Sequence, residues 1–241
     1  MELEKLLQQV VREQPQCNDK NTTKCIYNPI ELRKFYIQVL NQLILERSGG
    51  VKGLVLNEEI KTAINLICQY LNHEPEFINN EGFNFNKGLW LYGAFGSGKT
   101  QLIKAYRTSK KILFRETVGF KTCVQMNEAF KRIDKFLNEP QRYNGIDAFA
   151  NKFDTKERIF DDLGAEEITI NDFGNKLCIM EHILSERSKG FPKVKTHITT
   201  NLSMNQISSD YGGRIDSRSY EMFNFILLGK GVDSIDHRKT K

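Results

Sequence analysis

A short glycine-rich segment constrains the fold of this chain more than any other feature. Residues 93–100 read Gly-Ala-Phe-Gly-Ser-Gly-Lys-Thr, which matches the phosphate-loop (Walker A) pattern G-x-x-x-x-G-K-T. Residues 88–92 form an apolar run that predicts a buried strand, and residues 101–107 have apolar residues at helical spacing. A strand, a glycine loop and a helix in this order favour a phosphate-binding loop over a chance glycine-rich turn.

The residue types in this segment suit a bound triphosphate. Glycines let the backbone turn its N–H groups toward phosphate oxygens, where side chains would crowd the ligand. The start of the following helix adds free N–H groups and the positive end of its dipole. Lys99 would contact the β- and γ-phosphates, and Thr100 would offer its hydroxyl to Mg²⁺. The sequence therefore predicts ATP and Mg²⁺ as ligands, with these residues around the nucleotide: Gly93, Ala94, Phe95, Gly96, Ser97, Gly98, Lys99, Thr100 and Gln101.

Two adjacent acids end a later apolar run. Residues 158–162 read Arg-Ile-Phe-Asp-Asp and predict a strand with acids at its end. Asp161 would reach Mg²⁺ directly or through water, and Asp162 would orient or activate the attacking water. The alternative is an ordinary Asp-Asp turn, but the Walker A pattern upstream favours the catalytic interpretation.

The strand predicted over residues 194–200 ends in the run His-Ile-Thr-Thr-Asn at 197–201, so Asn201 stands at its carboxyl end. A polar side chain at the carboxyl end of a parallel strand lies where such sheets bind ligands. Asn201 would therefore contact the γ-phosphate or hold the water. It could also cap the helix that starts near Ser203, and the two roles are compatible.

Arginines late in the chain are candidates for neutralising phosphate charge. Arg214 and Arg218 lie four residues apart, so they share one face of a predicted helix, and such a residue can act in trans as an arginine finger. Surface ion pairs with Asp210, Asp216 or Glu221 are the alternative. Arg238 follows the last predicted strand, where it could reach the nucleotide in cis or belong to a basic tail.

Predicted strands and helices alternate from Lys87 onward, which implies a three-layer α/β fold with a parallel sheet. Upstream of that residue, helices are expected over residues 2–13, 29–46 and 57–71. We therefore expect a small helical N-terminal, partner-binding region over 1–84 and a P-loop ATPase domain over 85–241. The later strands are expected at 121–126, 158–162, 194–200 and 224–228, and the helices at 98–109, 127–137, 145–153, 172–189 and 203–223, the last broken at Gly212-Gly213.

Composition narrows the protein class. The chain has 39% hydrophobic and 27% charged residues, which fits a globular protein with a sizeable core. No long apolar run or signal-peptide pattern is present, and the five scattered cysteines indicate free thiols in a reducing cytoplasm. Residues 1–87 carry 10 Lys/Arg and 11 Asp/Glu, a net −1, whereas residues 88–241 carry 25 and 19, a net +6. The predicted nucleotide-binding part is thus the basic part, which permits contact with DNA without requiring it.

Together, four segments resemble one family, the DnaC/IstB-like branch of AAA+ ATPases. They are residues 93–100, Ile-Phe-Asp-Asp-Leu-Gly-Ala-Glu at 159–166, Thr-Thr-Asn at 199–201 and Tyr-Gly-Gly-Arg-Ile-Asp-Ser-Arg at 211–218. The resemblance implies that Asp161 and Asp162 are the Walker B pair, Asn201 is sensor 1, Arg218 is the arginine finger and Arg238 is a sensor 2 residue. Such proteins load the replicative helicase or assist a transposase, and they assemble side by side on single- or double-stranded DNA with ATP at subunit junctions.

Several alternatives stay open at this point. Residues 1–84 carry no recognised motif, so the sequence does not choose between a helicase and a transposase as partner. A slow ATP-gated adaptor would need nucleotide occupancy more than turnover, and the complete set of catalytic residues argues against it. A small-molecule P-loop kinase would need an arginine-rich lid, whereas the arginines here gather late in the chain.

Overall fold

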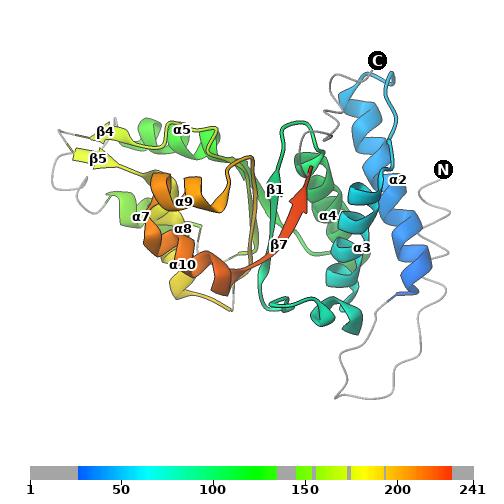
Figure 1. Cartoon of the computed structure of the whole chain (residues 1–241). Coiled ribbons are helices and arrows are strands. Elements are labelled where there is room, and N and C mark those ends of the chain that lie inside the picture. Colours follow the sequence, from blue (N-terminus) through cyan, green and yellow to red (C-terminus); the bar gives the residue numbers. More distant parts are fainter. Residues whose placement is uncertain (1–26, 135–144, 154–155, 173–174, 193, 230–241) are drawn as a thin grey trace. The chain divides into compact units, whose positions relative to one another are not determined.

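The computed structural model describes residues 27–134, 145–153, 156–172, 175–192 and 194–229 (Figure 1). The described residues form two compact units. We call residues 27–85, 94–117 and 227–229 the helical unit, and residues 86–93 with the described part of 118–226 the sheet unit. The predicted helix over 2–13 lies outside the described residues. None of the described helices has the length and apolar character needed to cross a bilayer.

The helical unit contains α2 (Pro29–Arg47), α3 (Glu58–Asn72), the 3₁₀ helix η1 (Pro75–Asn79) and α4 (Lys99–Phe114). Asparagines cap the first two of these helices. The Asn28 side chain accepts hydrogen bonds from the N–H groups of Ile30 and Glu31, and Asn57 accepts one from Ile60. These caps satisfy N–H groups that have no partner within the helix, and they fix where each helix starts.

Helices α2 and α3 pack directly against α4 (Figure 1). The Tyr36 hydroxyl donates to the carbonyl of Leu102 at 2.6 Å, and the Tyr27 hydroxyl donates to that of Leu113 at 2.8 Å. Both tyrosines are buried, so each hydroxyl needs such a partner. The helices that precede β1 therefore share a core with the helix that follows the glycine loop. The domain boundary near residue 84 stays a prediction.

The sheet unit is built on a five-stranded sheet of order β2-β3-β6-β1-β7. The pairs β2–β3, β3–β6 and β6–β1 are parallel, which confirms the predicted parallel sheet. The strands are β1 (Gly88–Gly93), β2 (Gly119–Thr122), β3 (Arg158–Leu163), β6 (Thr196–Thr200) and β7 (Phe223–Leu228), and the helices are α5 (Cys123–Asp134), α7 (Gly145–Asn151), α8 (Ile179–Lys189), α9 (Met204–Tyr211) and α10 (Gly213–Met222).

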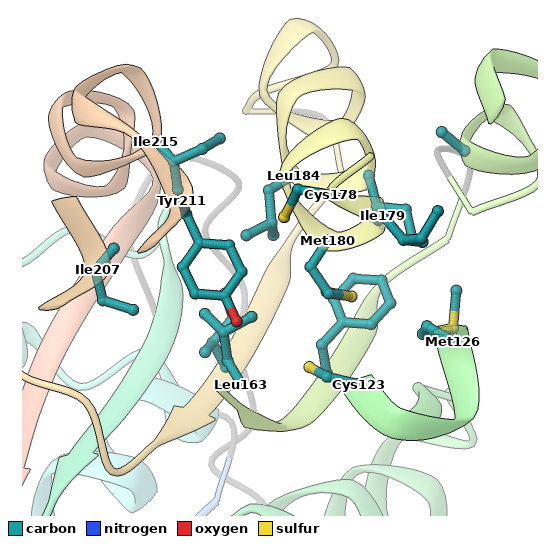
Figure 2. Close-up of a cluster of buried hydrophobic side chains, with 14 of the residues drawn as sticks. Cys123, Met126, Leu163, Cys178, Ile179, Met180, Leu184, Ile207, Tyr211 and Ile215 are labelled. Atoms are coloured by element: carbon teal, nitrogen blue, oxygen red, sulfur yellow. The ribbon is translucent and has the colours of Figure 1, made fainter. Parts of the chain in front are cut away.

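The core of the sheet unit joins these strands and helices. It combines aromatic, aliphatic and sulfur-containing side chains from β1, β3 and β6 with others from α5, α8, α9 and α10. Figure 2 shows part of it, where Tyr211 from α9 and Met180 from α8 meet Cys123 of α5 and Leu163 of β3. Packing of this kind holds the ends of β3 and β6 in place, and these ends carry the polar residues described below.

Several predicted elements were wrong in their bounds. The helix expected over 98–109 continues as α4 to Phe114, and the helix expected from residue 127 starts at Cys123. Residues 121–126 were expected to be a strand, but β2 ends at Thr122 and α5 starts at Cys123. Thr122 and Gln125 exchange hydrogen bonds between side chain and backbone, both at 3.1 Å. This is the reciprocal cap of the T-x-x-Q pattern, and it outweighs the β-branched character of the segment.

The helix expected over 172–189 starts later, at Ile179. Two short strands precede it, β4 (Ile170–Asp172) and β5 (Asn175–Leu177), and they pair antiparallel. The sequence Asn-Asp-Phe-Gly-Asn at 171–175 is rich in residues that disfavour helix interiors, and this local preference prevails over the helical spacing of the apolar residues around it.

Gly88 should tolerate no side chain. A Cβ atom built at this position would lie 1.5 Å from the carbonyl oxygen of Thr196, because β1 and β6 approach each other there as backbones. We expect Gly88→Ala to lower the free energy of unfolding by about 3 kcal/mol, at the upper end of overpacking effects. Chemical denaturation would measure it. Gly190→Ala is the control, because its Cβ would meet its nearest atom at an ordinary 3.6 Å; equal stability of the two variants would contradict this prediction.

Candidate functional site

The glycine loop follows β1 without interruption and leads into α4. Three of its glycines have positive φ angles: 124° at Gly93, 76° at Gly96 and 90° at Gly98. Residues with a Cβ atom rarely adopt such angles, so the loop depends on glycine at these positions. Gly98 is also the N-cap of α4, where N–H groups of the first helical turn lack helical partners. The local geometry is that of an anion-binding helix start.

Lys99 lies inside the loop and not on its surface. Its side chain is only 5% exposed, and Nζ donates to the carbonyl of Ala94 at 2.6 Å and to the Ser97 hydroxyl at 3.2 Å. The loop is anchored at its start, because the Ala94 N–H donates to the Leu228 carbonyl at 3.0 Å. Phe95, by contrast, is 68% exposed. The loop thus holds a buried ammonium group among its own oxygen atoms.

A second group of polar residues lies in the sheet unit, at the carboxyl ends of β3 and β6. Asp161 is 4% exposed, and its Oδ1 accepts a hydrogen bond from the Thr199 hydroxyl at 2.6 Å. The same Thr199 oxygen accepts the backbone N–H of Asp162 at 2.9 Å. The Thr199 hydroxyl on β6 therefore contacts both acidic residues of β3, Asp161 through its side chain and Asp162 through its backbone.

Asp162 has an unusual backbone conformation. Its φ angle is +63°, and the register of β3 against β6 shifts between Phe160 and Leu163, which marks a β-bulge. Aspartate tolerates this left-handed conformation better than most residues, although it remains uncommon. Bulges re-aim side chains, and here the Asp162 carboxylate accepts a hydrogen bond from the Asn201 amide at 3.1 Å. Local strain of this kind clusters at functional sites.

The alternative role of Asn201 as a helix cap is excluded. The N-cap of α9 is Ser203, which forms a complete capping box with Gln206. Asn201 donates instead to Asp162, so its side chain belongs to the same group as the acidic pair. The structure thus brings together Asp161, Asp162 and Asn201 within the sheet unit, and Ala94, Ser97 and Lys99 within the helical unit.

Arg218 lies on α10, where it is half-buried and donates from Nη1 to the Ser185 hydroxyl of α8 at 2.9 Å. Arg214, one turn earlier, is exposed. Within the described part of the chain, neither arginine pairs with Asp210, Asp216 or Glu221, so the alternative of surface ion pairs is not realised there. Arg238 lies outside the described residues.

A buried carboxylate follows the acidic pair. Glu166 is 7% exposed; Oε2 accepts the Gly164 N–H at 2.8 Å and Oε1 accepts the Tyr211 hydroxyl at 2.5 Å. Burial raises the pKa of the Glu166 carboxyl, and the hydrogen bonds from Tyr211 and Gly164 oppose that shift. Burial, followed by the nearby Glu166 charge, raises the pKa of Tyr211, which therefore keeps its proton and donates.

The sequence did not single out Thr199, Glu166, Tyr211 or Ser185. A signal for Thr199 was available, since Thr199 and Asn201 are two apart and residues so spaced share one face of a strand. Glu166 and Tyr211 each lie in a segment that was recognised, but their contact joins residues 45 apart in the chain. The hydrogen bond from Arg218 to Ser185 also joins residues far apart in the chain, so no local sequence pattern predicts it.

The residues at hand fit Mg²⁺ chemistry. Asp161 and Thr100, predicted to hold the ion, both offer hard oxygen atoms, which Mg²⁺ prefers while keeping several of its waters. No group of three or more His, Cys, Asp or Glu side chains that could hold a metal ion occurs within the described ranges. Mg²⁺ is commonly bound through one or two carboxylates together with substrate phosphates, so a single carboxylate such as Asp161 suits that kind of ion better than a closed metal cage.

Comparison with known proteins bears on the fold. No protein-family model matches the sequence, and neither does any curated protein. Among solved structures, the crystal structure of the DnaC helicase loader matches with a TM-score of 0.51 and 22% identity, over 73% of this chain and 93% of that chain. DnaI matches with a TM-score of 0.47 and 22% identity (73% of this chain, 87% of that chain), and AMPPCP-bound DnaA from Aquifex aeolicus with 0.47 and 16% (75% and 50%).

At these identities, the DnaC match supports a conclusion about the fold. The predicted fold class, a P-loop NTPase of the AAA+ type with a parallel sheet, is confirmed. The predicted resemblance to DnaC-like proteins is confirmed at the level of the fold, and the chain has the AAA+ fold that it shares with the DnaC helicase loader.

Proposed function

We propose that this chain binds and hydrolyses ATP and uses the cycle to load or remodel a DNA-bound partner, most specifically as a loader of the replicative helicase in DNA replication. The observation that carries the hydrolytic part is the group formed by Asp161, Thr199, Asp162 and Asn201. A nucleotide-binding loop alone would need no such group, whereas hydrolysis needs an acid to orient water and a second acid for the metal ion.

Each residue has a distinct role in this proposal. Lys99 would place its ammonium against the β- and γ-phosphates. Thr100 and Asp161 would hold Mg²⁺, which would neutralise phosphate charge. Asp162 accepts a hydrogen bond from the attacking water and takes up its proton. Asn201, bonded to Asp162 at 3.1 Å, keeps that carboxylate aligned and contacts the γ-phosphate side. The positive φ at Asp162 serves this alignment by turning its side chain toward Asn201.

The helicase-loading part is supported by the fold shared with the DnaC helicase loader and by the basic charge of the predicted ATPase domain. A net +6 over residues 88–241 favours contact with single- or double-stranded DNA through phosphate neutralisation. We propose that copies of the chain assemble with ATP at their junctions, that Arg218 completes the site of a neighbouring copy, and that Arg238 contacts the nucleotide in cis. An IstB-like role beside a transposase is the alternative partner assignment.

Arg218→Ala should lower the maximal ATPase rate about 100-fold while ATP affinity stays within about twofold, as expected for a group that acts on developing phosphate charge. Steady-state phosphate release and fluorescent-nucleotide titration would measure the two effects. Arg132→Ala is a matched control, because that side chain is 81% exposed in the same unit.

Mixing two inactive variants tests whether Arg218 acts in trans. A Lys99→Ala copy still carries Arg218, and an Arg218→Ala copy still carries the phosphate loop. We expect the mixture to regain activity that neither variant shows alone. A mixture no more active than its components would contradict action in trans, although it would leave hydrolysis itself standing.

The partner assignment is tested with the full chain. We expect it to co-elute with a purified replicative helicase hexamer in the presence of ATP and single-stranded DNA, and to separate from the helicase after hydrolysis. Co-elution with a transposase, and none with the helicase, would replace the loader assignment by the transposition one.

A further inference from the structure

The buried carboxylate of Glu166 joins two segments that flank the proposed hydrolytic residues. Its two oxygens accept hydrogen bonds from different elements: Gly164 in the loop after β3, at 2.8 Å, and Tyr211 at the end of α9, at 2.5 Å. All of these residues belong to the sheet unit. Such a bridge fixes the distance between the two segments, because a carboxylate with two donors has little freedom to rotate.

The Gly164 end of the bridge is tightly packed. Gly164 has a φ angle of +94°, and a Cβ atom there would lie 2.5 Å from Cδ1 of Leu202, the residue directly after Asn201. The loop behind Asp162 therefore lies against the segment that carries Asn201. A displacement of this loop would disturb both ends of the Asp162–Asn201 hydrogen bond.

The Tyr211 end leads to Arg218. Tyr211 is 1% exposed and extends from α9 into the buried cluster, as Figure 2 shows, with its hydroxyl toward Leu163. The next residue, Gly212, has a φ angle of +85° and joins α9 to α10, the helix of Arg218. Tyr211 is thus the last residue of α9, and its hydrogen bond to Glu166 lies directly before the change of direction into α10.

Glu166 forms no ion pair within the described part of the chain. The ionisable groups facing it are Asp162 on β3, Tyr211 on α9, Cys123 on α5 and Cys178 before α8. Burial raises the pKa of both thiols, that of Cys178 to about 11, so neither thiol carries charge near neutral pH. A buried carboxylate without an ion pair is costly, and the arrangement is therefore poorly explained by stability alone.

We propose that Glu166 is a positioning residue of the hydrolytic site: its bridge from Gly164 to Tyr211 holds Arg218 in a fixed relation to the Asp162–Asn201 pair. This inference rests on the proposed ATP hydrolysis. The acidic pair responds to the nucleotide of its own copy, and Arg218 is offered to the neighbouring one. Through this bridge, the nucleotide bound at one copy's site influences the position of Arg218, which acts at the site of the neighbouring copy.

Three variants separate geometry from charge. In Glu166→Gln the amide oxygen can accept from Gly164 while the amide N–H donates to the Tyr211 oxygen, so both links persist without charge. Glu166→Ala removes both links, and Tyr211→Phe removes one. We expect kcat for ATP to fall about 10- to 30-fold in Glu166→Ala and about fivefold in Tyr211→Phe, with KM within twofold, whereas Glu166→Gln stays within about threefold of wild type. A loss in Glu166→Gln equal to that in Glu166→Ala would overturn the positioning role in favour of a role for the charge.

Tyr27→Phe is the control for loss of a buried tyrosine hydrogen bond, because the Tyr27 hydroxyl donates to Leu113 in the helical unit. Its melting temperature should fall about as much as that of Tyr211→Phe, while its kcat stays at the wild-type value. A purely structural role of Glu166 would give the Tyr211→Phe and Tyr27→Phe variants the same kcat.

The decisive test is a double-mutant cycle with Arg218. If the bridge acts through that arginine, Glu166→Ala should cause no further loss of kcat in an Arg218→Ala background. Independent, multiplicative losses would overturn the inference while leaving the proposed function intact. Absence of any ATP turnover in the wild-type chain, by contrast, would defeat the proposed function itself.

Discussion

Lys99→Ala is expected to weaken ATP binding at least 100-fold, the largest effect on affinity in this protein. The Lys99 ammonium is buried in the glycine loop, with Ala94 and Ser97 oxygens 2.6 and 3.2 Å from Nζ. A charged group held at low exposure interacts strongly with phosphate, and its removal leaves the backbone N–H groups of the loop as the remaining anion ligands. Titration with a fluorescent ATP analogue would measure the change.

Lys111→Ala provides the control for Lys99→Ala, because Lys111 lies on the same helix, in its last turn, with an exposed side chain. It removes one positive charge from α4 and none from the loop, so its affinity should stay near that of wild type. ATP affinity that falls equally in both variants would indicate a general charge effect and would remove Lys99 from the proposed site.

Asp162→Asn is expected to leave ATP affinity almost unchanged and to lower kcat about 100- to 1000-fold, within the range for loss of a general base. Asparagine keeps an oxygen that can accept from Asn201, and it tolerates the φ angle of +63° found at this position. The substitution therefore removes the charge and basicity with little disturbance of the bulge. Single-turnover hydrolysis of bound ATP would separate the chemical step from binding and release.

The control for Asp162→Asn is Asp210→Asn, which changes a half-exposed aspartate on α9 of the same unit. Its turnover should match wild type. Comparing Lys99→Ala with Asp162→Asn also tests whether the two residues have separate roles. The first variant should lose ATP binding, and the second should bind ATP but lose the hydrolytic step. A variant of Asp162 that hydrolyses ATP at the wild-type rate would assign the water-orienting role to another residue.

The fold could be predicted largely because its strands are short apolar runs with strong flanking signals. The strand before the glycine loop and the strand ending in Asp161 and Asp162 were placed within one or two residues. Two of the failures, at Cys123 and in the stretch before Ile179, have a related cause: local capping and the low helix preference of Asn, Asp and Gly prevailed over hydrophobic spacing. The T-x-x-Q pattern at Thr122 was visible in the sequence and would have corrected the first.

The candidate site was predictable as a set of positions but not as a geometry. Chain order places Asp162 and Asn201 at strand ends, and the carboxyl ends of parallel strands face the same way. The hydrogen bond from Asn201 to Asp162 joins residues 39 apart in the chain, and the hydrogen bond from Tyr211 to Glu166 joins residues 45 apart. Such contacts depend on strand register and on packing, for which a single sequence carries no local pattern.

Whether this chain hydrolyses ATP is measured by Mg²⁺-dependent phosphate release from the purified full chain, compared with that from Lys99→Ala. We expect release well above the Lys99→Ala background, lost on chelation of Mg²⁺ and increased by single-stranded DNA or by higher protein concentration. Phosphate release no greater than that of Lys99→Ala under all of these conditions would contradict ATP hydrolysis by this chain.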